Sequence, residues 1–297
     1  MTSPDPAPSV GSAERTPFPG EFDAYGLTHP GKVRESNQDH FLVSSLRKRM
    51  EIHFSSLPNA GQWAPADERL AYLAMVADGV GSGRKGEEAS RTAIEAIAQY
   101  VAQSMRCYYD VDSSDEGVFL DALHEAAMRC HASVVQKAEE DPSRAGMATT
   151  LTLWLGVWPQ AYFLQVGDSR CYLFRDGVLT QITRDQTMAQ ELVDQGVLTR
   201  ADADNSRWAH VLSSAIGGSE SVPVVTRIDQ AWKHVGLLCS DGLTKHVSDE
   251  RIRERLSSME SAKQVCQDLL QDALDGGGSD NITVVVGRLR PGGRGSA

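Results

Sequence analysis

The chain has 297 residues and a formal net charge of -11 at pH 7, with 40 acidic against 29 basic side chains. A nucleic-acid-binding surface is normally basic, so this charge argues against that class of partner, and general solubility is its simplest explanation. The length allows one large domain or two modest ones.

Both ends of the chain are expected to be flexible tails. Residues 1–20 are rich in Pro, Ser and Ala and lack the basic start and apolar core of a signal peptide, and residues 291–297 are of the same kind. No linker or internal repeat interrupts the chain between them. We therefore expect a single domain over residues 21–290.

The first part of that domain is predicted to form strands. Residues 22–29 and 40–45 have the composition of strands and flank the polar segment GKVRESNQD, whereas the mixed polar stretch 46–68 is typical of a loop insertion. The run LAYLAMVAD at 70–78 predicts a buried strand that ends on Asp78.

The period then changes to that of a helix. Ala93, Ile97, Val101 and Met105 recur every four residues, and a similar apolar stripe runs from Phe119 to Val134. This spacing predicts two amphipathic helices in succession.

The rest of the chain alternates between strands and polar segments. The dipeptide Asp176-Gly177 predicts a hairpin turn, residues 184–218 are polar and partly helical, and two short helices are centred on Ile252 and Leu269. The predicted strands are 149–157, 161–168, 170–177, 178–183, 222–229, 234–241 and 282–289.

This grouping of strands and helix pairs defines the expected fold class. Clustered strands with helix pairs between them favour an α+β protein in which two antiparallel sheets face each other and helix pairs cover the outside. The most apolar stretch, 147–166, is interrupted by Pro159 and Gln160, so we do not expect a membrane-spanning helix.

The cysteines indicate a reducing, cytoplasmic environment. There are five, an odd number without a CxxC pair, which predicts neither a zinc site nor a disulfide framework. Cys239 adjoins an acidic motif but ends an apolar run with no histidine nearby, so a buried core thiol is favoured over a nucleophile.

Three aspartates carry most of the functional information. Asp78 in VADGVG, Asp241 in CSDG and Asp280 in GSDN each stand where an apolar run ends or begins, beside Gly or Asn. Carboxylates held there suit Mg²⁺ or Mn²⁺, which prefer oxygen ligands. The alternative is that Asp78 and Asp241 begin turns and that Asp280 caps a strand entry.

The glycine-rich segment after Asp78 is not a nucleotide-binding loop. In GVGSGRKG, Lys85 precedes Gly86, which is the reverse of the order that a Walker motif needs. We interpret the segment as a turn that exposes the carbonyl of Gly79 and then begins a helix.

Six motifs in a fixed order resemble a known family. GKVRESNQD, VADGVGSGRKGEEAS, GMATT, GDSR, CSDG and GGGSDNITVVV together are similar to the bacterial metal-dependent type-2C protein serine/threonine phosphatases, over nearly the whole ordered chain. The resemblance implies a sandwich of two antiparallel sheets with two Mn²⁺ or Mg²⁺ ions at one end.

The resemblance also implies roles for individual residues. Asp78 would bridge both ions, the Gly79 carbonyl would bind one, and Asp241 and Asp280 would hold the other. Arg34 would bind the substrate phosphate and Asp39 would order water beside the ions, while Asp168 and Arg170 would brace the site. Glu35 is expected to be polar surface, because the family's metal-binding glutamate falls at the position of Gln38.

The sequence departs from the family pattern at several positions. Two aspartates that hold a third ion in many bacterial members are here Ala145 and Lys245, so we expect only two ions. Ala148 replaces a glycine, which we interpret as a packing change. Val80 stands where some eukaryotic members have a histidine, and His246 is expected to be an ordinary surface residue.

Two functional hypotheses follow. The first is a cytoplasmic phosphatase, which we expect to be a monomer without a nucleic-acid or membrane partner. It would remove phosphate from phosphoserine and phosphothreonine in substrates of a bacterial Ser/Thr kinase. The second is a regulatory pseudophosphatase that binds phosphoproteins without turnover.

Overall fold

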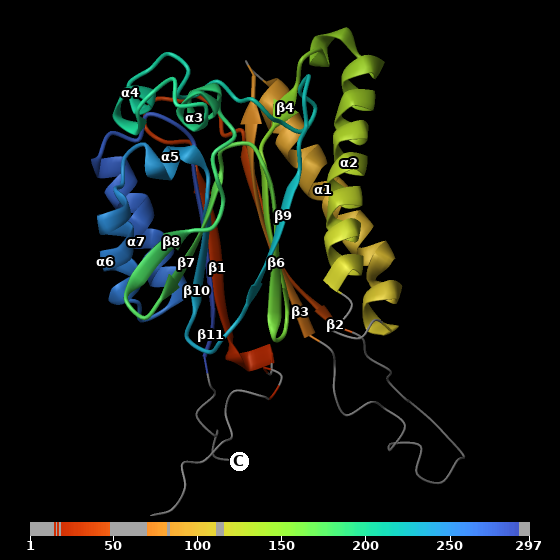
Figure 1. Cartoon of the computed structure of the whole chain (residues 1–297), viewed down its shortest axis with the longest axis vertical. Coiled ribbons are helices and arrows are strands. Elements are labelled where there is room, and N and C mark those ends of the chain that lie inside the picture. The colour runs from red at the N-terminus through yellow and green to blue at the C-terminus, as the bar shows by residue number, and fades with distance from the viewer. Residues whose placement is uncertain are drawn as a thin grey trace, which may run out of the picture.

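The computed structural model describes residues 15, 17, 19–47, 70–81, 84–110 and 116–290 (Figure 1). Most of the expected insertion at 46–68 and most of the two expected tails lie outside the described residues. Leu46 and Arg47, the first residues of that expected insertion, instead complete a strand.

Two sheets form the centre of the molecule, and every strand pairing is antiparallel. The first sheet has the order β1 (Phe22–His29), β11 (Ile282–Leu289), β10 (Val235–Cys239), β7 (Arg170–Arg175) and β8 (Val178–Gln181). The second has the order β2 (Asp39–Arg47), β3 (Leu70–Val80), β5 (Leu151–Val157), β6 (Gln160–Val166) and β9 (Val224–Asp229), and β4 (Ala148–Thr149) pairs with the end of β3.

Helices cover the outer face of each sheet (Figure 1). The second sheet carries α1 (Arg84–Asp110) and α2 (Glu116–Glu140), and the first carries α5 (Asp241–Thr244), α6 (Asp249–Ser257) and α7 (Ala262–Asp275). The remaining helical segments are α3 (Met188–Asp194), α4 (Arg200–Asp204) and the 3₁₀ turns η1 (Pro19–Glu21) and η3 (Pro142–Arg144). The predicted α+β sandwich is confirmed.

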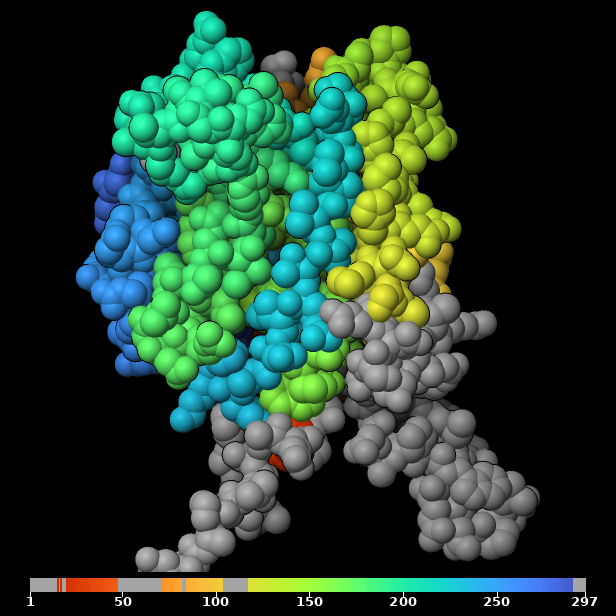
Figure 2. Space-filling model, in the orientation of Figure 1, coloured from red at the N-terminus to blue at the C-terminus, as the bar shows by residue number. Residues whose placement is uncertain are grey.

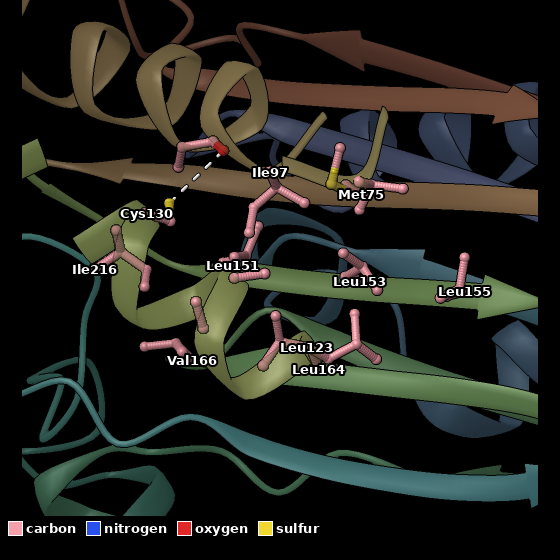
Figure 3. Packing of buried hydrophobic residues seen from close by; sticks show 14 of the residues in the cluster. Met75, Ile97, Leu123, Cys130, Leu151, Leu153, Leu155, Leu164, Val166 and Ile216 are labelled. Carbon is pink, nitrogen blue, oxygen red and sulfur yellow. Dashed lines mark hydrogen bonds between the residues drawn. The ribbon is translucent and has the colours of Figure 1, made fainter. Parts of the chain in front are cut away.

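Apolar side chains fill all three interfaces between the layers. Figure 3 shows residues of α1 and α2, such as Ile97 and Leu123, packed against Leu153 and Leu164 of the second sheet. A separate cluster lies under α6 and α7, and a smaller one, which includes Val76 and Phe163, lies between the two sheets. This burial fixes the relative position of the sheets and therefore of the loops at their ends.

Several local predictions hold. The strands at 22–29 and 282–289 match β1 and β11, and the hairpin between β7 and β8 has positive φ at both Asp176 (51°) and Gly177 (80°), as a type I′ turn requires. The strand containing Asp78 is longer than predicted, because β4 pairs with Gly79 and Val80 and extends it. The four-residue helix α5 was not predicted.

The end of the sandwich at the top of Figure 1 carries the loops of interest. There β2 and β11 begin, while β3 and β10 end, so residues from four separate motifs meet at one edge. The segment 184–218, with α3 and α4, forms a projecting mass at that end in Figure 2. None of the described helices is long and apolar enough to cross a bilayer.

Candidate metal centre

The sheet register brings the first two carboxylates together. Asp39 and Asp78 are direct partners across the β2–β3 ladder. Asp241 is the first residue of α5, immediately after β10, and Asp280 lies just before β11. Like charges opposite each other destabilise a sheet, so this pairing favours a cation or a proton at the site.

A cavity of about 530 Å³ opens at this edge. The residues that line it include four carboxylates together with the predicted phosphate ligand and the predicted carbonyl ligand: Asp78, Asp168, Asp241, Asp280, Arg34 and Gly79. The structure therefore gathers Arg34, Gly79 and the three signature aspartates in one place, although they come from distant parts of the chain.

Asp39 lies behind this cavity, with only 3% of its surface exposed. The hydroxyl groups of Ser240 and Thr283 each donate a 2.7 Å hydrogen bond to Asp39 Oδ2. Its Oδ1 is buried without a hydrogen-bond partner among the described residues. A buried carboxylate oxygen without a donor is costly unless a proton or cation satisfies it.

Two threonines fix the backbone of Asp78. Thr150 Oγ1 accepts a 3.0 Å hydrogen bond from the Asp78 amide, and the hydroxyl of Thr149 donates to the Asp78 carbonyl over 2.8 Å. The next residue, Gly79, lies so close to the start of α1 that a Cβ there would collide with the carbonyl oxygen of Gly86. Glycine at 79 is thus required by the approach of the helix to the strand.

The loop that carries Arg34 is anchored beside Asp280. The Asn281 side-chain amide donates to the carbonyls of Pro30 and Ser36 over 3.0 and 2.9 Å, and its oxygen accepts from the Gln38 amide over 2.9 Å. Arg34 Nε in turn lies 2.9 Å from Asp280 Oδ1.

Lys245 contacts two of the aspartates that line the cavity. Its Nζ lies 2.6 Å from Asp241 Oδ2 and 2.7 Å from Asp280 Oδ2, whereas Asp241 Oδ1 is buried without a partner. The following residue, His246, is not simply surface: its Nε2 accepts from the Ser279 amide over 2.9 Å and so holds the turn before Asp280. Glu35 is exposed, as predicted.

The crowded carboxylates resist ionisation. Burial, followed by the charges of neighbouring aspartates, raises the pKa of Asp78 well above its ordinary value. Burial likewise raises the pKa of Asp39 to about 6 and that of Asp168 to about 8. Asp280 is the exception: burial opposes its charge, but Lys245 and Arg34 lower its pKa.

The oxygen atoms at this edge are of the type that binds a hard divalent cation. All of them are carboxylate or carbonyl oxygens, and Asp39 Oδ1 and Asp241 Oδ1 have unused acceptor capacity. As they stand, no three His, Cys, Asp or Glu side chains within the described ranges converge on a point that could hold a metal ion. The ammonium of Lys245 lies between two of the donors that would have to converge.

Ala145 stands at the second of the two positions where an aspartate would help to hold a third ion, and it has no carboxylate. Ala145 follows η3, and its carbonyl oxygen accepts a 2.9 Å hydrogen bond from Lys85 Nζ. A lysine therefore occupies one of the two positions at which an aspartate for a third ion would stand, and another lysine contacts the backbone at the second.

A second cavity, of about 460 Å³, lies under α3 and α4 and shares Asp168, Asp241 and Lys245 with the first. Arg170, predicted to brace the site, donates to both oxygens of Asp185 at 2.7–3.1 Å and so ties β7 to this segment.

His210 lines both cavities and was not predicted, because nothing in its local sequence marks it. Ser240 and Thr283 were not predicted as site residues either, although both lie within motifs that the sequence analysis singled out.

Comparisons with known proteins agree with this geometry. Residues 56–284 match the family described as Protein phosphatase 2C. The chain is 39% identical over 217 residues to the serine/threonine protein phosphatase PstP of Mycobacterium tuberculosis, a match that covers 73% of this chain but 40% of PstP. It is 30% identical over 268 residues to the serine/threonine phosphatase Stp of Listeria monocytogenes, which covers 87% of this chain and 92% of Stp.

Among solved structures, the catalytic domain of PstP in complex with two manganese ions superposes with a TM-score of 0.70 at 32% identity. That match covers 91% of this chain and 99% of the PstP domain.

Proposed function

This chain belongs to the protein phosphatase 2C family, and from that premise we propose that it is a metal-dependent protein serine/threonine phosphatase. The observation that carries the proposal is the cavity at the end of the sandwich, where four carboxylates and Arg34 face a common space. No thiol or hydroxyl nucleophile is needed, because water attacks the phosphorus in this mechanism.

The proposed cofactors are two Mn²⁺ or Mg²⁺ ions. Asp78 would contribute to both, the Gly79 carbonyl to one, and Asp241 and Asp280 to the other, with Asp39 behind them. When bound, such a pair activates water for attack and neutralises the phosphate oxygens. The manganese-containing PstP domain supports this number of ions.

The chain's own groups then have separate tasks. Arg34, on the loop anchored by Asn281, binds the phosphate through its forked donors. Asp39 orders water beside the ions and is itself held by Ser240 and Thr283. The segment 184–218 overhangs the second cavity and would contact the protein part of the substrate.

The substrates are proposed to be phosphoserine and phosphothreonine proteins, products of a bacterial Ser/Thr kinase. The names of the PstP and Stp relatives support this class. Four described cysteines are buried free thiols, which is compatible with action in the cytoplasm. We propose that the enzyme acts as a monomer.

Hydrolysis of a phosphothreonine peptide tests this function. We expect turnover with Mn²⁺, loss of turnover in EDTA, and loss in Asp241→Ala, whereas Asp275→Ala, an exposed change at the end of α7, should retain it. If no metal condition gives turnover but the protein still binds the peptide, the pseudophosphatase hypothesis replaces the enzyme. The names of the relatives reported above give that alternative no support.

A further inference from the structure

The ammonium group of Lys245 lies where a divalent ion would be expected to bind. It contacts one oxygen of Asp241 at 2.6 Å and one of Asp280 at 2.7 Å. These are the two carboxylates proposed to hold the same ion. A Mg²⁺ or Mn²⁺ ion needs such oxygens at about 2.0–2.2 Å, so it and the ammonium would compete for one position.

The fold holds Lys245 in this place. Asp241 and Lys245 are four residues apart at either end of α5, and the Lys245 amide donates to the Asp241 carbonyl over 2.9 Å. Its side chain is only 23% exposed. Its Nζ lies within 2.7 Å of two carboxylate oxygens, which compensate its positive charge.

The carboxylates have little further capacity while Lys245 is in place. Asp280 Oδ1 accepts hydrogen bonds from Arg34 Nε at 2.9 Å and from the backbone N–H of Asn281 at 3.0 Å. Its Oδ2 contacts Lys245. Only the Oδ1 of Asp241 is left without a partner. An ion that takes both aspartates must therefore displace the ammonium, because two cations cannot share these oxygens at such short range.

We propose that Lys245 is a tethered competitor of the divalent ion held by Asp241 and Asp280. It bridges the two carboxylates when that ion is absent and turns away when the ion binds. The side chain thereby stabilises the ion-free protein and weakens the binding of the ion. This inference rests on the proposed function only in placing the ion between these two aspartates.

A different role for the same lysine makes the opposite prediction. If Lys245 instead kept its contacts with Asp241 and Asp280 while the ions were bound, and so oriented these carboxylates for the ions, its removal would leave the affinity unchanged or weaken it. The sign of the change in affinity therefore separates the two roles.

Calorimetric titration of the ion-free protein with MnCl₂ measures that sign. We expect Lys245→Met, which keeps the length of the side chain and removes its charge, to bind Mn²⁺ about tenfold more tightly than the wild type. Lys245→Arg, which keeps the charge, should stay near the wild-type affinity. Lys263→Met removes an exposed lysine from α7 and serves as the matched control.

Thermal unfolding of the same proteins gives a second readout that does not depend on activity. In EDTA, Lys245→Met should unfold at a lower temperature than Lys263→Met, because Asp241 and Asp280 then repel each other without a counter-ion. Saturating Mn²⁺ should raise the unfolding temperature of Lys245→Met by more than that of the wild type.

The outcomes separate this inference from the proposed function. Equal or weaker Mn²⁺ affinity in Lys245→Met, with Mn²⁺ still bound and lost in Asp241→Ala, overturns the role of Lys245 and leaves the metal centre intact. If neither the wild type nor Lys245→Met binds Mn²⁺, both the inference and the proposed function are overturned.

Discussion

The guanidinium of Arg34 lies 2.9 Å from a carboxylate oxygen of Asp280, although 246 positions separate the two residues along the chain. The group proposed to bind phosphate is therefore paired with a group proposed to bind an ion. An ion on Asp280 would neutralise that carboxylate and make Arg34 available to the substrate.

Removal of Arg34 should therefore weaken substrate binding more than ion binding. We expect Arg34→Ala to raise KM for a phosphothreonine peptide by about 10- to 100-fold, because charge-assisted hydrogen bonds to the phosphate are lost. Arg34→Lys should recover only part of this, since it lacks the fork. Steady-state kinetics against Arg253→Ala, an exposed change on α6, measures the effect, and an unchanged KM would refute the assignment.

Gly79 should not tolerate a side chain. A Cβ at this position meets the Gly86 carbonyl, so we expect Gly79→Ala to lower the free energy of unfolding by about 1–3 kcal/mol. Gly117→Ala, where the added carbon meets no described atom within 4 Å beyond its own turn of helix, should leave it unchanged or raise it by up to about 1 kcal/mol. Urea denaturation compares the two, and equal effects would contradict the packing argument.

The elements that the sequence predicted best are those with a strong local signal. The strand 282–289 is rich in β-branched apolar residues, and Asp176-Gly177 is a turn whose backbone only a few residue types adopt readily. The three aspartates were found because each stands beside a residue typical of turns at a strand boundary. Their convergence depends on the pairing of distant strands and became visible only in the fold.

The elements that were missed depend on partners elsewhere in the chain. Strand β3 runs on past Asp78 because a two-residue strand, β4, pairs with it, and no local pattern marks β4. Helix α5 is four residues long, too short for a periodic signal. The sequence shows that position 245 carries a positive charge. That this charge lies 2.6 and 2.7 Å from two carboxylates could be seen only in the fold.

Asp168 should make the stability of the ion-free protein depend on pH. Burial, followed by the charge of Asp241, raises its pKa from 3.8 to about 8. Between these values the folded state binds more protons than the unfolded state, so the stabilising contribution is present at low pH and is lost as pH rises. Asp168→Asn removes this dependence.

The free energy of unfolding of Asp168→Asn, minus that of the wild type, should therefore increase from about pH 5 to about pH 8 in EDTA. Urea titrations at several pH values measure this difference, in which the contributions of titrating groups that do not interact with Asp168 cancel. A difference that stays constant or falls with pH would contradict the raised pKa.

The hydrogen bonds that Asp39 accepts should contribute more to the free energy of unfolding than those of a surface threonine. Thr283→Val removes a 2.7 Å donor from a buried carboxylate, and we expect it to lower the free energy of unfolding near neutral pH by about 1.5–3 kcal/mol. Thr180→Val, on the exposed side of β8, should change it by less than about 0.5 kcal/mol. Similar losses in both variants would show that Asp39 does not depend on this donor.

We propose that the acidic edge of the sandwich is a two-ion centre from which Lys245 must withdraw. Anomalous diffraction from crystals equilibrated with Mn²⁺ tests it most directly. We predict one peak in contact with Asp78, Asp241 and Asp280, and a second at Asp78 and the Gly79 carbonyl, with Lys245 turned away from both aspartates. A map without peaks at this edge, with the Lys245 ammonium still between Asp241 and Asp280, would show that these residues do not form a two-ion centre.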